Sequence, residues 1–72
     1  MADGTYKVIE LIGTSTTSWE EAAATAVMTA AKSLEDLRVA EVVQLDMKLD
    51  GVTNKVIAYR AKVMVSFRYH GE

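Results

Sequence analysis

The spacing of hydrophobic and polar residues predicts a strand near the start of the chain, followed by a loop. Residues 5–12 alternate, with one face made of Tyr6, Val8, Glu10 and Ile12 and the other of Lys7, Ile9 and Leu11. Because successive side chains of a strand point to opposite faces, this strand is apolar on most of both faces. Residues 13–18 are small and mostly hydroxylated, which is typical of a loop that leads into a helix.

A helix is predicted from Trp19 to about Leu34. Ser18 and Glu21 have the spacing of a capping box, in which the serine oxygen accepts the N–H of Glu21 and the glutamate reaches back to the amide of Ser18. The apolar face follows the helical repeat and consists of Trp19, Ala23, Ala26, Val27, Ala30 and Leu34. We expect Trp19 to cover one end of the core; the alternative is a stacking platform for an aromatic ligand.

The second half of the chain predicts two long strands joined by a turn. Residues 38–50 and 56–69 both alternate, and Asp50-Gly51 between them is a turn signal. Strict alternation gives one face of the earlier strand to Val39, Glu41, Val43, Leu45, Met47 and Leu49, and the other to Arg38, Ala40, Val42, Gln44, Asp46, Lys48 and Asp50. The last strand has a continuous apolar face, made of Ile57, Tyr59, Ala61, Val63, Val65, Phe67 and Tyr69.

These elements predict an α+β fold with the order β-α-β-β, in a single domain spanning residues 1–72. A right-handed crossover makes the first and second strands parallel, so the third strand lies between them and antiparallel to both. The result is a three-stranded antiparallel sheet, in the order 1-3-2, wrapped on one helix. Its second face is half polar and uncovered, and function is expected there.

The composition adds a reason to expect self-association. Half of the 72 residues are hydrophobic and the chain has no cysteine, so a disulfide cannot compensate for a small core. A domain of this size buries only about 60% of the surface that its unfolded chain exposes. A second copy of the chain is the simplest cover for the remaining apolar surface.

The charge balance disfavours polyanionic partners. Eight Lys and Arg stand against ten Asp and Glu, without a basic stripe, which argues against nucleic acid and against an anionic membrane surface. The chain has no apolar segment of transmembrane length, and Met1-Ala2-Asp3-Gly4 does not resemble a signal peptide. The expected location is therefore the cytoplasm.

The chemistry-bearing residues do not indicate an enzyme. No catalytic triad or acid–base pair is present, and His70 is the single histidine. Glu41, Asp46 and Asp50 are the candidate metal ligands, but calcium takes six to eight oxygens, so these residues need copies related by a symmetry axis. The alternative interpretation is that they are solvated or form salt bridges; the cations available for this are Arg38, Lys48 and Arg60.

Three segments of the sequence resemble the dodecin family. They are residues 8–15, VIELIGTS, ahead of an alanine-rich helix, residues 39–43, VAEVV, and residues 63–67, VMVSF. Dodecins are small β-α-β-β proteins that assemble as hollow dodecamers of cubic symmetry. The resemblance covers nearly the whole chain and implies a homododecameric binding or storage protein without enzymatic turnover.

The resemblance also locates a flavin site, which is substituted here. Flavin-binding members have a tryptophan at the start of the second strand and a glutamine on the third, and the matching positions are Val39 and Arg60. Valine has no ring to stack on isoalloxazine, and arginine only donates hydrogen bonds whereas glutamine also accepts them. Riboflavin or FMN is therefore the alternative ligand and not the preferred one.

A branch of the family without that tryptophan is described as calcium-binding. It shares the Thr-Ser-Trp-Glu helix start and the Arg-Val-Ala strand start, seen here at residues 17–20 and 38–40. This resemblance makes calcium the expected ligand. Asp46, supported by Asp50 and Glu41, is the ligand set that carboxylate position suggests. A third hypothesis is a purely structural or regulatory oligomer whose partner is another protein.

Overall fold

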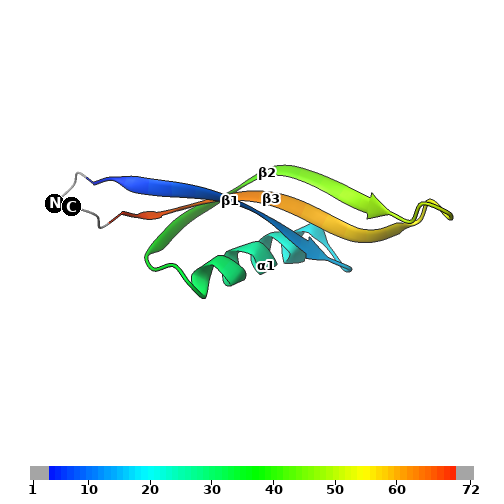
Figure 1. Ribbon diagram of the computed structural model, residues 1–72, viewed down its shortest axis with the longest axis horizontal. Helices are drawn as coiled ribbons and strands as arrows, with labels where there is room; N and C mark the ends of the chain where they lie inside the picture. Colours follow the sequence, from blue (N-terminus) through cyan, green and yellow to red (C-terminus); the bar gives the residue numbers. More distant parts are fainter. Residues whose placement is uncertain (1–3, 70–72) are drawn as a thin grey trace.

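The fold is a three-stranded antiparallel sheet with one helix on one face. The computed structural model describes residues 4–69, so His70 lies outside the described residues. The elements are β1 (Tyr6–Ser15), α1 (Trp19–Ala31), β2 (Leu37–Leu49) and β3 (Val56–Arg68). β3 is the central strand and pairs with both β1 and β2, which gives the order β1-β3-β2 (Figure 1). The predicted α+β class, element order and strand order are confirmed.

Two element boundaries differ from the prediction by about three residues, and the others agree to within one residue. β1 continues to Ser15, because Gly13 and Ser15 stay in register with Ala61 and Tyr59 of β3. The helix ends at Ala31 and not near Leu34, since the following residues form a turn whose N–H groups still donate to carbonyls of the last helical turn. The chain then reverses into β2 at Asp36, whose φ of 59° is in the left-handed region.

Small side chains form the core between α1 and the sheet. The buried residues are Ala22, Ala26 and Ala30 of the helix and Ala61, Val63 and Val65 of β3. The predicted apolar face of β3 is thus confirmed at its centre. The predicted helix face omitted Ala22, which is completely buried because it lies against Gly13 of β1. A glycine at that position lets the helix backbone approach the sheet closely.

A β-bulge makes the predicted faces of β2 wrong. Val42 pairs with Val63, but the next pair is Gln44 with Lys62, so Val43 is an extra residue in the strand. An extra residue shifts the alternation by one position. As a result, residues 39–42 lie on the faces opposite to those that strict alternation, extended from residues 44–48, assigned to them.

The helix cap forms only half of the predicted capping box. The Ser18 hydroxyl accepts the N–H of Glu21 at 3.0 Å, as expected. The Glu21 carboxylate does not bond the Ser18 amide. It accepts hydrogen bonds from the hydroxyl of Thr17 at 2.6 Å and from that of Ser15 at 3.3 Å. The Ser18 N–H points instead to the Ser15 oxygen, at 3.4 Å. The extension of β1 to Ser15 explains the difference, because it brings a competing hydroxyl to the helix start.

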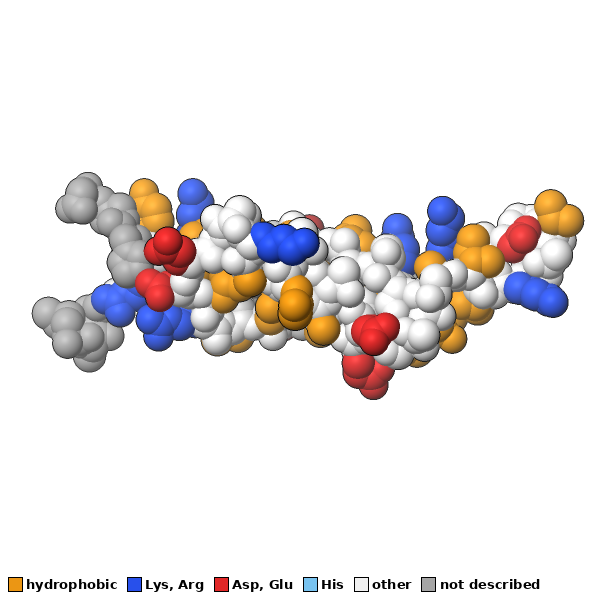
Figure 2. All heavy atoms as spheres, turned by 90° about the horizontal axis from the view of Figure 1, so that it is seen from below, with side chains coloured by type: hydrophobic (Ala, Val, Ile, Leu, Met, Phe, Trp, Pro, Cys, Tyr) orange, Lys and Arg blue, Asp and Glu red, His pale blue; other side chains and the backbone are white. Residues whose placement is uncertain are grey.

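The sheet extends well beyond the helix that covers it. The 13 residues of α1 make a helix about 20 Å long, whereas the 13 residues of β2 or β3 make a strand about 43 Å long. The paired ends of β2 and β3 therefore project as an arm, residues 45–60 (Figure 1). Apolar side chains stay exposed along it, as the view from the helix side shows (Figure 2); those of the arm are Leu45, Met47, Leu49, Val52, Val56 and Ile57.

The shape of the chain departs from that of an isolated globule. Its extents are 55 × 20 × 17 Å and its accessible surface is 5362 Å². A compact monomer of the same mass exposes about 4,400 Å². Its radius of gyration is 14.9 Å, against about 11 Å for a compact chain of this length. Many large hydrophobic side chains are among the exposed residues, which agrees with the self-association expected from composition.

The contact between Gly13 and the helix gives a test of the fold. A Cβ at Gly13 would overlap the carbonyl oxygen of Ala22 and lie 2.9 Å from the backbone nitrogen of Ala26. Gly13→Ala must therefore push the helix off the sheet, and we expect a loss of about 2 kcal/mol or more in the free energy of unfolding. The thermal midpoint, measured at one protein concentration, should fall by about 8 °C or more.

Gly51 is the matched control for this substitution. A Cβ there meets no atom within 4 Å and the backbone φ is not positive. Gly51→Ala should stay within about 0.5 kcal/mol of the original protein. Equal midpoints for the two variants would contradict the close packing of α1 on β1.

Candidate functional site

The face of the sheet away from α1, called the open face below, gathers the candidate residues. Directly paired residues of antiparallel strands share a face. The register therefore places on the open face Tyr6, Val8, Glu10, Ile12 and Thr14 of β1, Arg60, Lys62, Met64, Ser66 and Arg68 of β3, and Val39, Glu41, Gln44, Asp46 and Lys48 of β2. Because of the bulge, Val39 and Glu41 lie on the same face as Asp46, which strict alternation did not predict.

The strongest polar contact of the open face is an ion pair between Asp46 and Arg60. The two residues face each other across β2 and β3. Arg60 Nε donates to Oδ1 of Asp46 at 2.7 Å, and Nη2 donates to Oδ2 at 3.1 Å. Both carboxylate oxygens are therefore engaged by one guanidinium fork, the geometry that gives specificity to such pairs. The side chain of Arg60 is 42% exposed and that of Asp46 is 38% exposed, so water reaches both of them.

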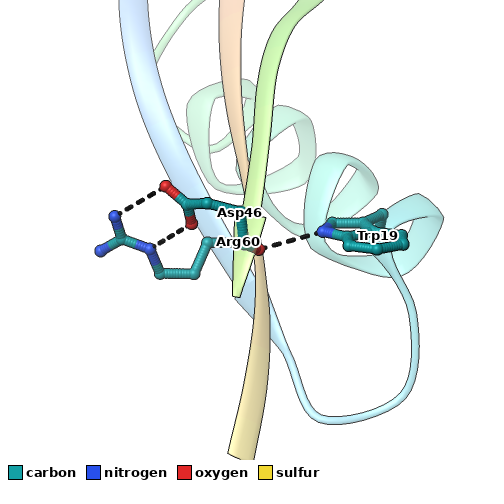
Figure 3. A network of polar contacts seen from close by, with 3 residues as sticks. All are labelled: Trp19, Asp46 and Arg60. Atoms are coloured by element: carbon teal, nitrogen blue, oxygen red, sulfur yellow. Dashed lines mark hydrogen bonds and ion pairs between the residues drawn. The ribbon is translucent and has the colours of Figure 1, made fainter. Parts of the chain in front are cut away.

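Trp19 holds the backbone of Asp46 from the other side of the strand. Its indole Nε1 donates to the carbonyl oxygen of Asp46 at 3.0 Å, and its ring meets the Tyr59 ring edge-on, with centroids 5.1 Å apart. Figure 3 shows the indole and the carboxylate on opposite sides of β2. Trp19 is therefore engaged by protein groups of β2 and β3, whereas the side chains that pack on the buried core are Ile9, Leu11, Ala23, Val27 and Leu37. The contact with Asp46 was not predicted, because it joins residues far apart in sequence.

The ion pair changes the acidity of both partners. Hydrogen bonds from Arg60, and its positive charge, hold the pKa of Asp46 below the ordinary value of 3.8. Lys62 lowers the pKa of Asp46 further through its charge alone. The same contact raises the pKa of the Arg60 guanidinium above its ordinary value. Asp46 is therefore a carboxylate, and Arg60 a cation, at any neutral pH.

Asp50 lies in the hairpin and organises its turn. Oδ1 of Asp50 accepts the N–H of Val52 at 2.8 Å and that of Thr53 at 3.3 Å. These two backbone hydrogen bonds hold its pKa below the ordinary value. The Asp50 carbonyl accepts the N–H of Asn54, whose φ of 64° closes the turn. The predicted turn at residues 50–51 is confirmed, and one oxygen of Asp50 already has a structural role.

Glu41 lies on the open face, exposed and opposite Met64. Glu10 is paired with the same methionine from the other side, so the two glutamates flank the central strand. Sequence reasoning overlooked Glu10, because nothing local in the sequence reveals which residues share a partner on β3.

One chain does not bring the three predicted metal ligands together. An extended chain rises about 3.3 Å per residue. Asp46 is therefore more than about 10 Å along the chain from Glu41, and also from Asp50. Within residues 4–69, no group of three His, Cys, Asp or Glu side chains is placed to hold a metal ion. Carboxylates are the right donors for calcium, but it needs six to eight oxygens. The donor type fits calcium; the donor number in one chain does not.

The two positions that correspond to the flavin site are Val39 and Arg60. Val39 is 62% exposed and lines a shallow cleft of about 210 Å³ beside the helix. The guanidinium of Arg60 forms its two hydrogen bonds with Asp46.

The described part of the chain contains no helix long and apolar enough to cross a membrane.

Comparison with known proteins identifies relatives over nearly the whole chain. The family model described as Dodecin matches residues 5–70. A protein of Mycobacterium tuberculosis named Calcium dodecin is 54% identical over 63 residues, which cover 88% of this chain and 86% of that protein.

Solved structures with the same fold include dodecins. The crystal structure of the calcium dodecin from Mycobacterium tuberculosis, described as having a novel calcium-binding site, is 50% identical, with a TM-score of 0.81 and 94% coverage of both chains. The dodecin from Streptomyces coelicolor is 28% identical, with a TM-score of 0.90 over the full length of both chains.

The lowered pKa of Asp46 predicts how the ion pair responds to acid. A carboxyl whose folded pKa is depressed stabilises the fold above its unfolded pKa, near 4, and this contribution disappears as the pH falls through the lower, folded pKa. The thermal midpoint of the original protein should therefore decrease as the pH is lowered below about 4. Asp46→Asn cannot lose a charge there, so its midpoint should fall less steeply over the same pH range.

The control for this comparison is Glu20→Gln, which removes an exposed carboxylate at the helix start, outside the ion pair. Its pH profile should follow that of the original protein. An Asp46→Asn profile as steep as the original would show that the pair contributes nothing to acid stability.

Proposed function

Because the chain belongs to the dodecin family, we propose that it is a homo-oligomeric binding or storage protein whose ligand is calcium. The observation that carries the proposal is the 54% identity to Calcium dodecin over 88% of the chain. Identity at this level supports a shared ligand more strongly than a shared fold does. The replacement of the flavin-stacking tryptophan by Val39 agrees with it.

We propose a dodecamer as the assembled form. The fold is that of the dodecins, and the chain exposes more surface than a compact monomer of its mass, with many large hydrophobic side chains in it. The exposed hydrophobic side chains are concentrated on β2 and on the arm, most of which α1 does not cover. Packing against further copies of the chain would remove this surface from water.

The proposed calcium ligands are Asp46, with Asp50 and Glu41 in support. A site at a symmetry axis receives one carboxylate from every copy, so three copies of one aspartate already supply up to six oxygens. Asp46 is the first choice because its carboxylate lies on the open face and its backbone is fixed by Trp19. We propose no catalytic role for any of these residues and expect the protein in the cytoplasm.

Calorimetry tests the calcium proposal. Calcium added to the purified, assembled protein should release or absorb heat in a saturable titration, and Asp46→Asn should weaken binding at least about ten-fold, since it replaces a charged ligand by a neutral one. Glu20→Gln, with the same change of charge on the helix, should bind like the original protein. No saturable heat at millimolar calcium would refute calcium binding and favour the structural or regulatory oligomer.

Flavin binding is the alternative and makes a separate prediction. We expect riboflavin and FMN to keep their fluorescence when titrated with the assembled protein, because Val39 offers no ring and the Arg60 fork is occupied by Asp46. Stacking a flavin between aromatic rings quenches its emission. Saturable quenching at micromolar or lower flavin would reverse the order of the two ligands.

A further inference from the structure

The face of β2 on the side of α1 carries an apolar row that the helix leaves exposed. Its members, called the β2 stripe below, are Ala40, Val42, Leu45 and Met47. We propose that the β2 stripe is the contact surface for a second copy of this chain and that the open face on the other side of the sheet is not needed for this contact. The inference rests on the proposed homo-oligomer and names the surface through which it forms.

The first step of the argument is that the bulge at Val43 creates the stripe. Val42 pairs with Val63 and Leu45 pairs with Ala61, and paired residues share a face. Val63 and Ala61 are two positions apart on β3, so they lie on one face of the sheet. Strict alternation would have placed Val42 and Leu45 on opposite faces. The bulge brings them into one row of eight residues, about 25 Å long, which is longer than α1.

The second step is that the cover provided by α1 ends between β3 and β2. Val63 and Ala61 are completely buried, whereas Val42 and Leu45, directly beside them on the same face, are 47% and 50% exposed. Neighbouring strands lie only about 4.8 Å apart. One strand spacing therefore separates the buried core from exposed apolar side chains, because α1 packs mainly on β1 and β3. The β2 stripe is a sheet face without its second layer.

The third step is that the stripe continues into a cleft beside the helix. This cleft of about 210 Å³ lies where Val27 of α1 comes near Leu37 and Ala40 of β2, and Val65 of β3 also lines it. Its lining is mostly apolar, with Arg38 as the charged exception. A second copy that lies along the stripe can therefore place an apolar side chain in the cleft at its end.

The fourth step is the choice of a second copy as the partner. The chain exposes about 1,000 Å² more surface than a compact monomer of its mass, and a standard interface removes about 800 Å² from each partner. One contact of ordinary size thus accounts for most of the excess. The four members of the stripe carry no charge that would select a polyanion or a polycation. Association of identical chains is the commonest way in which soluble proteins cover such a surface.

Two substitutions with the same chemistry separate the two faces of the sheet. Leu45 and Ile12 are both 50% exposed. Leu45 lies opposite Ala61 and Ile12 lies opposite Lys62, so they flank adjacent positions of β3 but on opposite faces. Leu45→Glu therefore adds a charge to the β2 stripe, and Ile12→Glu adds the same charge to the open face.

The experiment measures the molar mass by light scattering over a dilution series of the original protein, Leu45→Glu and Ile12→Glu. A carboxylate in the apolar contact loses its water without gaining a partner. We expect Leu45→Glu to raise the concentration of half-dissociation at least about ten-fold, and Ile12→Glu to change it less than about two-fold. Circular dichroism of the three proteins should agree, because both positions are half exposed in the single chain.

The outcomes separate this inference from the proposed function. If Leu45→Glu assembles like the original protein, or if Ile12→Glu dissociates as readily as Leu45→Glu, the role of the β2 stripe is overturned while the homo-oligomer stands. An original protein that is monomeric at about 100 μM refutes the homo-oligomer and the inference together, and leaves the stripe to a different partner. If Leu45→Glu does not fold, Leu45→Ala and Ile12→Ala decide the question by the same dilution series, since they remove apolar surface without adding charge.

Discussion

The close contact between one short helix and one long sheet determines the rest of this structure. Gly13 lets Ala22 and Ala26 approach β1 at backbone distance, so helix and sheet are joined through their smallest side chains. That packing is tight but covers little area, because the helix is about half as long as the strands. The core therefore ends near the middle of the sheet, and most of the arm beyond the contacts of Trp19 remains without cover in a single chain.

The same limit explains where the polar residues lie. α1 covers mainly β1 and β3, so the edge strand β2 is exposed along most of its length. Charged side chains on an exposed strand remain hydrated, so they avoid the desolvation cost of a buried charge. The bulge at Val43 then aligns the two halves of β2 so that Val39, Glu41 and Asp46 share the open face. The exposed polar residues thus lie where the helix does not cover the sheet.

The sequence predicted the element order, the strand order and the apolar face of β3, because each follows from local periodicity and from short connections. It did not predict the bulge, since one extra residue leaves the hydrophobic pattern of β2 almost unchanged. The burial of Ala22 depends on a glycine nine residues earlier, and the Trp19 contact on a carbonyl 27 residues later. The Asp46–Arg60 pair was an open alternative in the sequence, and only the register decides which cation meets which carboxylate.

Electrostatics gives a reason why a paired carboxylate is compatible with an assembled site. In the proposed oligomer, copies of Asp46 that meet near a symmetry axis repel one another when no cation is present. A guanidinium on each carboxylate would compensate that charge within the same chain. The two-pronged contact also keeps each carboxylate oriented toward the open face. A valine or leucine in place of Arg60 would leave this repulsion uncompensated.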